Sequence, residues 1–260
     1  MKLLLDFKGD INKLDGKGDC NLVAIAYLHR QEEIMKYLIE KGASLDIGRS
    51  PLTIAAFGGD TDAIAYFLSK GANVNKTFIF DDKEERSPLL NAVCANKYQA
   101  AKLLLESKAD PNLQYQWNMK TNPNFFVSAL QISIDNMNTE IGQLLIDHGA
   151  NVNATVGKEP LIVYTAARGC IEEVKLLLEN GANPNARGDN GVTALIRTIS
   201  FRKNPRIVGL LLSYGADPRI EDNLLKKDAF SHAQDGQNDL EVIKLLNTIH
   251  PQKQKTTVPK

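Results

Sequence analysis

A six-residue phrase recurs along this chain and constrains its fold more than any other feature. Full copies read KGASLD at residues 41–46, KGANVN at 70–75, HGANVN at 148–153 and NGANPN at 180–185. Variants lie at 108–112 and 214–219, and a shortened copy lies at 8–12. Between the last residues of successive copies the spacings are 34, 29, 37, 41, 32 and 34. A period near 34 indicates a stack of similar units that each depend on their neighbours.

The residues around each phrase predict two helices per unit. An apolar cluster with helical spacing precedes the phrase, as at 34–39 and 174–178, and the glycine then ends that helix because it adopts the left-handed conformation easily. About twenty residues earlier, Ser50-Pro51 and Ser87-Pro88 supply a hydroxyl for the N-cap and a proline for the first helical position. Each unit is therefore predicted to be helix, short turn, helix, and a loop.

These motifs resemble the ankyrin repeat, most clearly in SPLTIAA at 50–56 and in the continuous stretch 169–195. The resemblance implies an all-α fold, an ankyrin-repeat solenoid of stacked helix-turn-helix units with extended finger loops. We expect a single array over 1–247, followed by a mobile basic tail at 248–260. The family's histidine in Thr-Pro-Leu-His is replaced by Thr53, Asn91 and Gln131 among others, so its hydrogen bond between turns is made differently or lost. The expected parts of the array are a half repeat 2–15, repeats 16–46, 47–75, 76–112, 113–153, 154–185 and 186–219, and a C-terminal cap 220–247.

Charge and composition argue against nucleic-acid and membrane partners. Lys plus Arg and Asp plus Glu are equal at 31 each, so the chain as a whole gives no field that favours a polyanion. The longest apolar runs are far shorter than the roughly 20 residues that a membrane-spanning helix needs, and a conventional secretory signal is not seen. Three well-separated cysteines argue against a disulfide framework and suit a reducing compartment. We therefore expect a cytoplasmic protein.

The sequence does not predict an enzyme. Cys20, Cys94 and Cys170 fall at different positions of their repeats, nothing places a histidine beside any of them, and small partly buried thiols are the expectation. Cysteine and histidine spacings do not match a zinc site. Gly58-Gly59 lacks the preceding strand and the following Gly-Lys-Ser/Thr of a phosphate loop and is interpreted as a helix-ending turn. We expect no cofactor and no metal.

Two adjacent insertions are rich in aromatic residues. The spacings of 37 and 41 place about three and about seven extra residues in the loops 74–86 and 111–127. Residues 114–126 have the pattern of neither a helix nor a strand. Insertions in repeat arrays often lie on the binding face, and Tyr and Trp are enriched among the residues that dominate interfaces. We predict partner-binding roles for Phe78 and Phe80 in the first loop and for Tyr115, Trp117 and Phe125 in the second.

An alternative stays open for these loops. The two fingers could instead pack on each other and on their own first helices, as a small satellite core in which Phe125 and Phe126 are the leading candidates. Both interpretations are compatible, because a packed base can hold an exposed tip.

The resemblance to ankyrin arrays also implies a binding face. Such proteins commonly recognise other proteins along their concave side. Carried over by position, residues just before a first helix or at its end become candidates, namely Arg49, Arg86, Phe57, Asp135 and Arg168. We expect a monomeric, non-catalytic interaction scaffold or adaptor that binds a partner protein, including an exported bacterial effector acting in host cytoplasm.

Two further functions remain open. The chain could be a regulatory or targeting ankyrin segment of a larger multidomain enzyme. It could also be a substrate, since Asn75, Asn153 and Asn185 resemble ankyrin asparagines that a cytosolic oxygenase hydroxylates.

Overall fold

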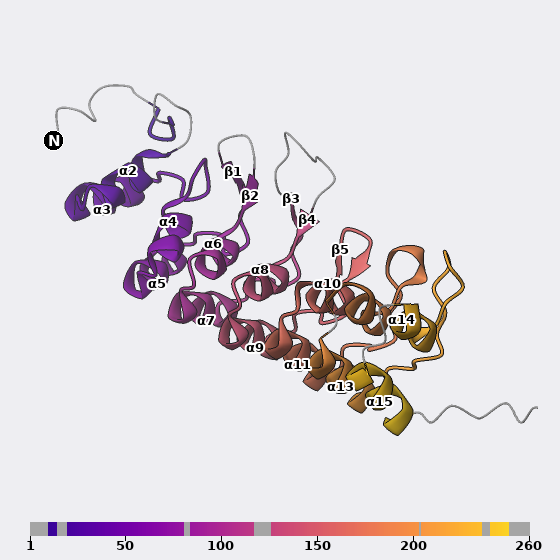
Figure 1. Cartoon of the computed structure of the whole chain (residues 1–260). Coiled ribbons are helices and arrows are strands. Elements are labelled where there is room, and N and C mark those ends of the chain that lie inside the picture. Colours follow the sequence, from indigo (N-terminus) through magenta and orange to yellow (C-terminus); the bar gives the residue numbers. More distant parts are fainter. Residues whose placement is uncertain are drawn as a thin grey trace, which may run out of the picture. The chain divides into compact units, whose positions relative to one another are not determined.

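The computed structural model describes residues 10–14, 20–80, 84–116, 126–202, 204–235 and 240–249. These residues belong to two compact units, 1–150 and 151–260, and each unit is described by itself. Both are built from pairs of short antiparallel helices, as expected for an all-α ankyrin fold, with short β-hairpins between some pairs (Figure 1).

The N-terminal unit contains successive helix pairs. They are α2 (Leu22–Leu28) with α3 (Glu32–Glu40), α4 (Pro51–Gly58) with α5 (Thr61–Ser69), α6 (Pro88–Cys94) with α7 (Tyr98–Glu106), and α8 (Ala129–Asp135) with α9 (Thr139–Asp147). The first helices α4, α6 and α8 pack in one row, and the second helices α5, α7 and α9 pack in another. Strand β1 (Phe78–Phe80) pairs antiparallel with β2 (Glu84–Arg86), and β3 (Tyr115–Gln116) pairs with β4 (Phe126–Val127). Both hairpins project from the side of the first helices (Figure 1).

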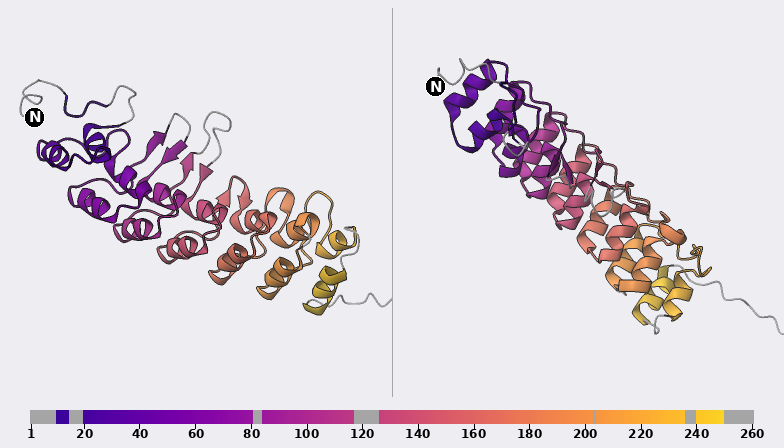
Figure 2. Two further views of the ribbon diagram at one scale, coloured as in Figure 1. Left: turned by 60° about the vertical axis from the view of Figure 1, so that its left-hand side comes forward. Right: turned by 90° about the horizontal axis from the view of Figure 1, so that it is seen from above.

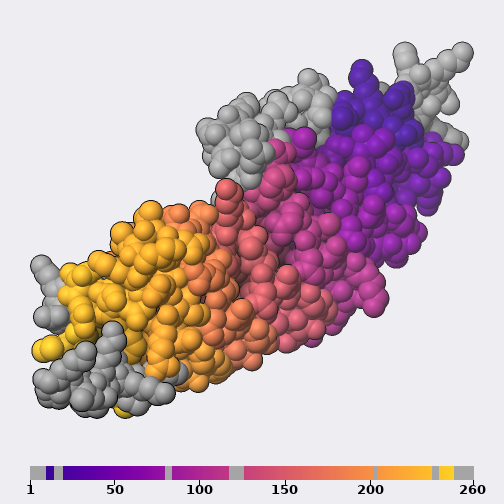
Figure 3. Space-filling model, turned by 90° about the vertical axis from the view of Figure 1, so that its right-hand side faces the viewer, coloured from indigo at the N-terminus to yellow at the C-terminus, as the bar shows by residue number. Residues whose placement is uncertain are grey.

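The C-terminal unit continues the same plan. Its elements are β5 (Thr155–Val156), β6 (Glu159–Pro160), α10 (Leu161–Arg168), α11 (Ile171–Glu179), the 3-10 helix η1 (Asp189–Gly191), α12 (Ala194–Arg197), the π-helical turn η2 (Thr198–Arg202), α13 (Pro205–Ser213), α14 (Ala229–Asp235) and α15 (Leu240–Ile249). Figure 2 shows the rows α10, α12, α14 and α11, α13, α15 in orange to yellow, and Figure 3 shows the packed surface of this unit.

The helix starts predicted at Ser50 and Ser87 are confirmed, because each hydroxyl accepts the backbone N–H three residues further on. Ser128 and Thr193 form the same kind of cap. Proline occupies the first position of α4 and α6, where its missing N–H has no intrahelical partner to lose. Helices of 7 to 9 residues are too short to be stable alone. Their stability comes from buried contacts with neighbouring pairs.

The recurring phrase links one repeat to the next. Its fourth residue fixes a turn within the phrase, as where the Asn183 side chain accepts the N–H of Asn185 at 2.9 Å. Its sixth residue reaches forward: Asn185 accepts the N–H of Asp217 at 2.7 Å and donates to the carbonyl of Gly215 at 3.0 Å. We call the asparagines that donate forward in this way the asparagine ladder. Its members are Asn75, Asn112, Asn153 and Asn185.

The ladder bears on the substrate hypothesis. In Asn75 and Asn153, as in Asn185, the side-chain amide both donates to and accepts from the following phrase. An oxygenase would therefore have to reach side chains that already hold two repeats together.

A hydrogen bond between neighbouring first helices is made by a residue one position after that of the family's histidine. The N-cap of α6 is Ser87, so the position of the family's histidine is Leu90, and the alignment of Asn91 with it was wrong. Asn91 nevertheless donates from Nδ2 to the carbonyl of Thr53 in the preceding repeat, at 3.3 Å. The contact between neighbouring first helices is thus kept by a different residue.

The expectation that residues 114–126 contain no strand was wrong at both ends of that segment. Tyr115 pairs with Val127, and Gln116 pairs with Phe126. An insertion must return to the repeat that it left, which brings its two ends side by side. Antiparallel pairing then gives the backbone N–H and C=O groups of both ends hydrogen-bond partners, which water would otherwise have to supply.

Candidate protein-binding site

A pocket of about 380 Å³ lies between the first hairpin and the first helices of the N-terminal unit. We call it the N-terminal pocket, and it is lined by Leu28, Arg49, Ile54, Phe57, Phe78, Arg86 and Asn91. Four of these residues, Arg49, Phe57, Phe78 and Arg86, are candidates that the sequence predicted. The structure therefore brings together residues that are up to 37 positions apart in the chain.

The apolar wall of the pocket follows from the helix register. Leu28 and Phe57 each lie seven residues after an N-cap, Asn21 and Ser50 respectively. They consequently occupy the same face of neighbouring helices, and they are 53% and 54% exposed. Sequence reasoning missed Leu28 because it recognised only hydroxyl caps, and aligning Asn21 with Ser50 would have found it.

The polar rim consists of two arginines that directly precede helix caps. Arg86 donates to Glu84 at 2.6 Å and to the Asn91 side-chain oxygen at 3.3 Å. The guanidinium of Arg49 lies 5.9 Å from the centre of the Phe78 ring, within the range of a cation–π contact. The rim thus carries two guanidinium groups, and Phe78 joins it to the apolar wall.

Tyr115 is buried, which corrects the prediction that it offers its ring to a partner. It is 1% exposed, and its hydroxyl lies 2.7 Å from the hydroxyl of Ser87. Burial raises the pKa of Tyr115 well above its ordinary value. Val127, which pairs with Tyr115 across the β3–β4 hairpin, is also buried, whereas Phe126 is 42% exposed. The base of the second hairpin therefore packs inward through Tyr115, and Phe126 does not belong to that packed base.

Among the remaining candidates, Trp117 and Phe125 fall outside the described residues, and so does the side chain of Phe80. Asp135 ends α8 without lining the pocket. Arg168 ends α10 in the C-terminal unit, where its guanidinium lies 5.6 Å from the Tyr164 ring centre.

A second pocket, of about 470 Å³, lies in the C-terminal unit. It is lined by Glu159, Val163, Tyr164, Ala167, Arg197 and Phe201. Arg197 donates to Glu159 at 2.5 Å, and its guanidinium lies 5.4 Å from the Phe201 ring centre. The two charges in this C-terminal pocket therefore neutralise each other.

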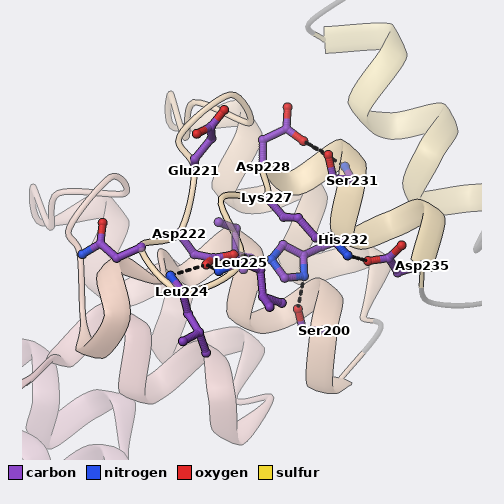
Figure 4. A network of polar contacts seen from close by, with 12 residues as sticks. Ser200, Glu221, Asp222, Leu224, Leu225, Lys227, Asp228, Ser231, His232 and Asp235 are labelled. Atoms are coloured by element: carbon purple, nitrogen blue, oxygen red, sulfur yellow. Dashed lines mark hydrogen bonds and ion pairs between the residues drawn. The ribbon is translucent and has the colours of Figure 1, made fainter.

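A polar network in the C-terminal unit connects Asp222, His232 and Ser200 (Figure 4). His232 Nε2 lies 2.7 Å from Asp222 Oδ2, and its Nδ1 lies 3.2 Å from the Ser200 hydroxyl. In a catalytic triad the carboxylate meets Nδ1 and the serine meets Nε2, so the ring nitrogens are exchanged here. We assign this network a structural role, because it ties the loop around Asp222 to α14 and η2.

The Asp222 carboxylate is held as an anion. Burial alone would raise its pKa, but the N–H groups of Leu225 and Leu224 and the His232 ring together lower the pKa to about 2. Cys94 shows the opposite effect: burial raises the pKa of its thiol to about 11.

The described ranges of the chain contain neither a metal-binding cluster nor a membrane-spanning helix. Within those ranges, acidic, histidine and cysteine side chains form no group of three or more that could hold a metal ion. Over the same part of the chain, no helix has the length and apolar character that crossing a bilayer requires.

Comparison with known proteins gives one consistent family. A model of ankyrin repeats matches residues 45–115, 113–188 and 130–222. The crystal structure of an ankyrin repeat domain from Acinetobacter baumannii is 27% identical and aligns with a TM-score of 0.65, over 76% of this chain and 97% of that one. The ankyrin repeat protein EF0377 is 30% identical, with a TM-score of 0.61, over 75% of this chain and 95% of its own.

Three of the curated relatives match over a third of their own length or less. A putative ankyrin repeat-containing protein from Treponema pallidum is 34% identical over 98 residues, which is 37% of this chain and 33% of that protein. For two further relatives the matched part is 12% and 7% of their length.

Proposed function

The chain belongs to the ankyrin-repeat family, and on that premise we propose that it binds a partner protein through the N-terminal pocket, as a non-catalytic scaffold. Ankyrin repeats are generally protein–protein interaction modules. The proposal adds to this general role a particular surface and the residues that form it.

One observation carries the proposal. Leu28 and Phe57 stand side by side in register and more than half exposed, beside the half-buried Phe78 and two arginines. Removing such apolar area from water is worth roughly 25 cal/mol per Å², and a pocket with apolar walls and a few polar groups is the usual form of a binding site. A partner side chain placed here would gain both apolar burial and a charged contact.

We further propose that the protein acts as an adaptor, that it is monomeric, and that it lies in the cytoplasm, including host cytoplasm for an exported effector. The alternative of a regulatory segment within a larger protein draws support from the relatives, because the matched part is at most 33% of the first three. The N-terminal pocket would serve either arrangement.

Capture by matched variants tests the proposal. The full chain is immobilised as wild type, as Phe57→Glu, and as Phe201→Glu, which changes a phenylalanine that is 71% exposed in the C-terminal unit. We expect at least one protein that wild type and Phe201→Glu retain and that Phe57→Glu loses. With the purified partner, its affinity for Phe57→Glu should fall at least about tenfold, or 1.4 kcal/mol.

Two results would contradict the proposed interface. If circular dichroism shows an intact fold and Phe57→Glu retains every captured protein, then the N-terminal pocket is not the interface. Loss from Phe201→Glu alone would move the site to the C-terminal unit.

A further inference from the structure

We infer that residues 1–9 dock as a helix on the outer side of α3 and cover the apolar face that this helix turns away from α5. The occupant of that face is thus a segment of the same chain, and its docking does not rest on the proposed function. Residues 1–9 lie outside the described residues, so the contacts that point to this docking begin at Asp10.

The shortened phrase at 8–12 makes the contacts of a full phrase. The Asp10 side chain accepts the N–H of Asn12 at 2.9 Å, which is the turn that fixes the other copies. Asn12 Oδ1 accepts the N–H of Ser44 at 2.7 Å, and Ser44 is the fourth residue of the following phrase. Asn185 makes the equivalent contact with the fourth residue of the phrase that follows it. The chain at Asn12 is therefore held against the next repeat as a full phrase is.

A second helix ends directly before each full copy of the phrase. The last residues of these helices, each one position before its phrase, are Glu40, Ser69, Asp147 and Glu179. The phrase at 8–12 occupies the equivalent place, so the residues before it are positioned to form a second helix beside α3.

The sequence of the segment is that of a second helix. Residues 1–12, MKLLLDFKGDIN, align without a gap with residues 174–185, VKLLLENGANPN, and are identical at five positions. The alignment places Leu3-Leu4-Leu5 at the positions of residues 176–178, three leucines of α11 that are 7%, 0% and 4% exposed. Burial of apolar side chains is the main favourable term in folding, so three adjacent leucines favour the docked segment over one in water.

The packing of α5 shows which face of a second helix meets the helix before it. A pocket of about 470 Å³ lies between α3 and α5, and α5 lines it with Ala63, Tyr66 and Phe67 among others. These residues lie three, six and seven positions after the N-cap Asp60. Those positions therefore face the preceding repeat.

The same positions of α3 form an apolar face that is covered only in part. Counted from its own N-cap, they are Ile34, Tyr37 and Leu38. Leu38 is buried, but Ile34 and Tyr37 are half-buried. The isoleucines at the position of Ile34 in α9 and α13 are Ile141 and Ile207, and both are 0% exposed. The outer side of α3 thus has the composition of a covered face and room for a further helix.

The register predicts which side chains meet. In α3 the residues four and five positions after the N-cap, Met35 and Lys36, line the pocket towards α5. The alignment with α11 gives Met1 and Lys2 these two positions, and Leu5 lies one turn further along the same side. Because successive second helices run in the same direction, Leu5 should lie against Tyr37.

The test uses the full chain with labelled methyl groups and amides. NMR should show contacts between the Leu5 methyls and the Tyr37 ring. Leu4→Asp changes the equivalent of Leu177, which is 0% exposed, and should speed hydrogen exchange of the α3 and Ser44 amides about a hundredfold, because an uncovered end pair opens more often. Amides of α13 report whether the rest of the array stays folded.

Matched variants separate docking from general destabilisation. Leu224→Asp makes the same change at a leucine that is 71% exposed and should leave exchange in α3 unaltered. Asn12→Ala removes the anchor at Ser44 and should speed exchange in α3 as Leu4→Asp does. If Leu4→Asp also speeds exchange in α13, the milder Leu4→Ala should speed exchange in α3 alone, about tenfold.

Three results would overturn the inference. One is equal exchange of the α3 amides in wild type, Leu4→Asp and Asn12→Ala. Another is the absence of any contact between Leu5 and the Tyr37 ring in wild type. The third is a wild-type dimer in light scattering that Leu4→Asp converts to a monomer, because the segment would then cover α3 of a second copy. Capture through Phe57 is measured separately, so each of these results leaves the proposed function standing.

Discussion

The hydroxyl of Tyr115 lies 2.7 Å from the hydroxyl of Ser87, the residue that caps helix α6. The second hairpin therefore supports the helix start of the preceding repeat, and the two inserted loops are coupled at their bases. Ser87 also accepts the N–H of Leu90 at 3.1 Å, so the tyrosine adds to the cap without replacing it.

Tyr115→Phe should lower the free energy of unfolding by about 1 kcal/mol, the usual net value of one buried hydrogen bond. Tyr115→Ala should cost about 3–5 kcal/mol, because it also empties the space of a buried ring. Urea denaturation followed by circular dichroism measures both. Tyr214→Phe, at a tyrosine that is 42% exposed, is the control and should change stability by less than about 0.5 kcal/mol. An equally neutral Tyr115→Phe would show that the hydroxyl contact carries no stability.

Gly188 should not tolerate a side chain. A Cβ added there would lie 1.9 Å from Glu159 Oε2, so the carboxylate must move and weaken its pairing with Arg197. We expect Gly188→Ala to destabilise the chain by about 1–2 kcal/mol. In a Glu159→Ala background the same change should be nearly neutral, and the double-mutant cycle measures this coupling. Additive effects would contradict the contact.

Gly209 offers the opposite outcome. It lies inside helix α13, and an added Cβ would find its nearest neighbour 4.0 Å away, at Leu245. Gly209→Ala should therefore stabilise the chain by about 0.5–1 kcal/mol, because alanine loses less backbone entropy in a helix. A loss of stability in thermal or urea unfolding would mean that this helix packs more tightly than the structure indicates.

Cys94 should react slowly with alkylating reagents. With a pKa of about 11, only about one thiol in a thousand is ionised at pH 8, against about a quarter for an ordinary thiol with a pKa near 8.5. The higher intrinsic reactivity of a more basic thiolate recovers roughly tenfold, which leaves a rate about 20-fold below that of glutathione. The rate should still be rising at pH 10.

The measurement uses a variant with Cys20→Ala and Cys170→Ala, so that iodoacetamide reports on Cys94 alone through intact mass. A rate at pH 8 equal to that of glutathione would contradict the burial of this thiol.

Because of Asp222, the free energy of unfolding should depend on pH in the acidic range. Its pKa is about 2 in the folded chain and about 3.9 when unfolded. A lowered folded pKa stabilises the fold above the unfolded pKa, and this contribution is lost as the pH falls from about 4 to about 2. Asp222→Asn should be less stable than wild type at pH 7, and the gap should narrow over that pH range. Asp189→Asn, at an exposed aspartate, is the control; a gap that stays constant with pH would exclude the Asp222 effect.

Local signals explain what could be predicted from the sequence. The caps at Ser50 and Ser87 lie where the motifs placed them, because a cap needs only a hydroxyl and the N–H three residues later. The proximity of Arg49 and Arg86 also follows from register, since both directly precede an N-cap and equivalent positions of stacked repeats become neighbours.

Long-range packing explains what could not be predicted. The sequence shows that residue 115 is a tyrosine, but the burial of Tyr115 depends on the neighbouring repeat, which supplies Ser87 as a partner 28 positions away. Likewise, the hydrogen bond from Asn91 to Thr53 crosses 38 positions, and a one-residue error in register hid it. The strand pairing at the base of the second hairpin could not be predicted either, because a strand of two residues is too short to show a periodic pattern.

The asparagine ladder has a direction, and that direction determines where it ends. Asn75, Asn153 and Asn185 each accept a backbone N–H from the following phrase and donate a side-chain amide to it. The copy at 214–219 receives Asn185 through Asp217, but its sixth residue is Arg219, whose side chain has donors and no acceptor. It cannot accept an N–H from the loop that follows. The last helix pair, α14 and α15, is joined to this phrase by a backbone hydrogen bond instead, from the N–H of Ala229 to the carbonyl of Pro218.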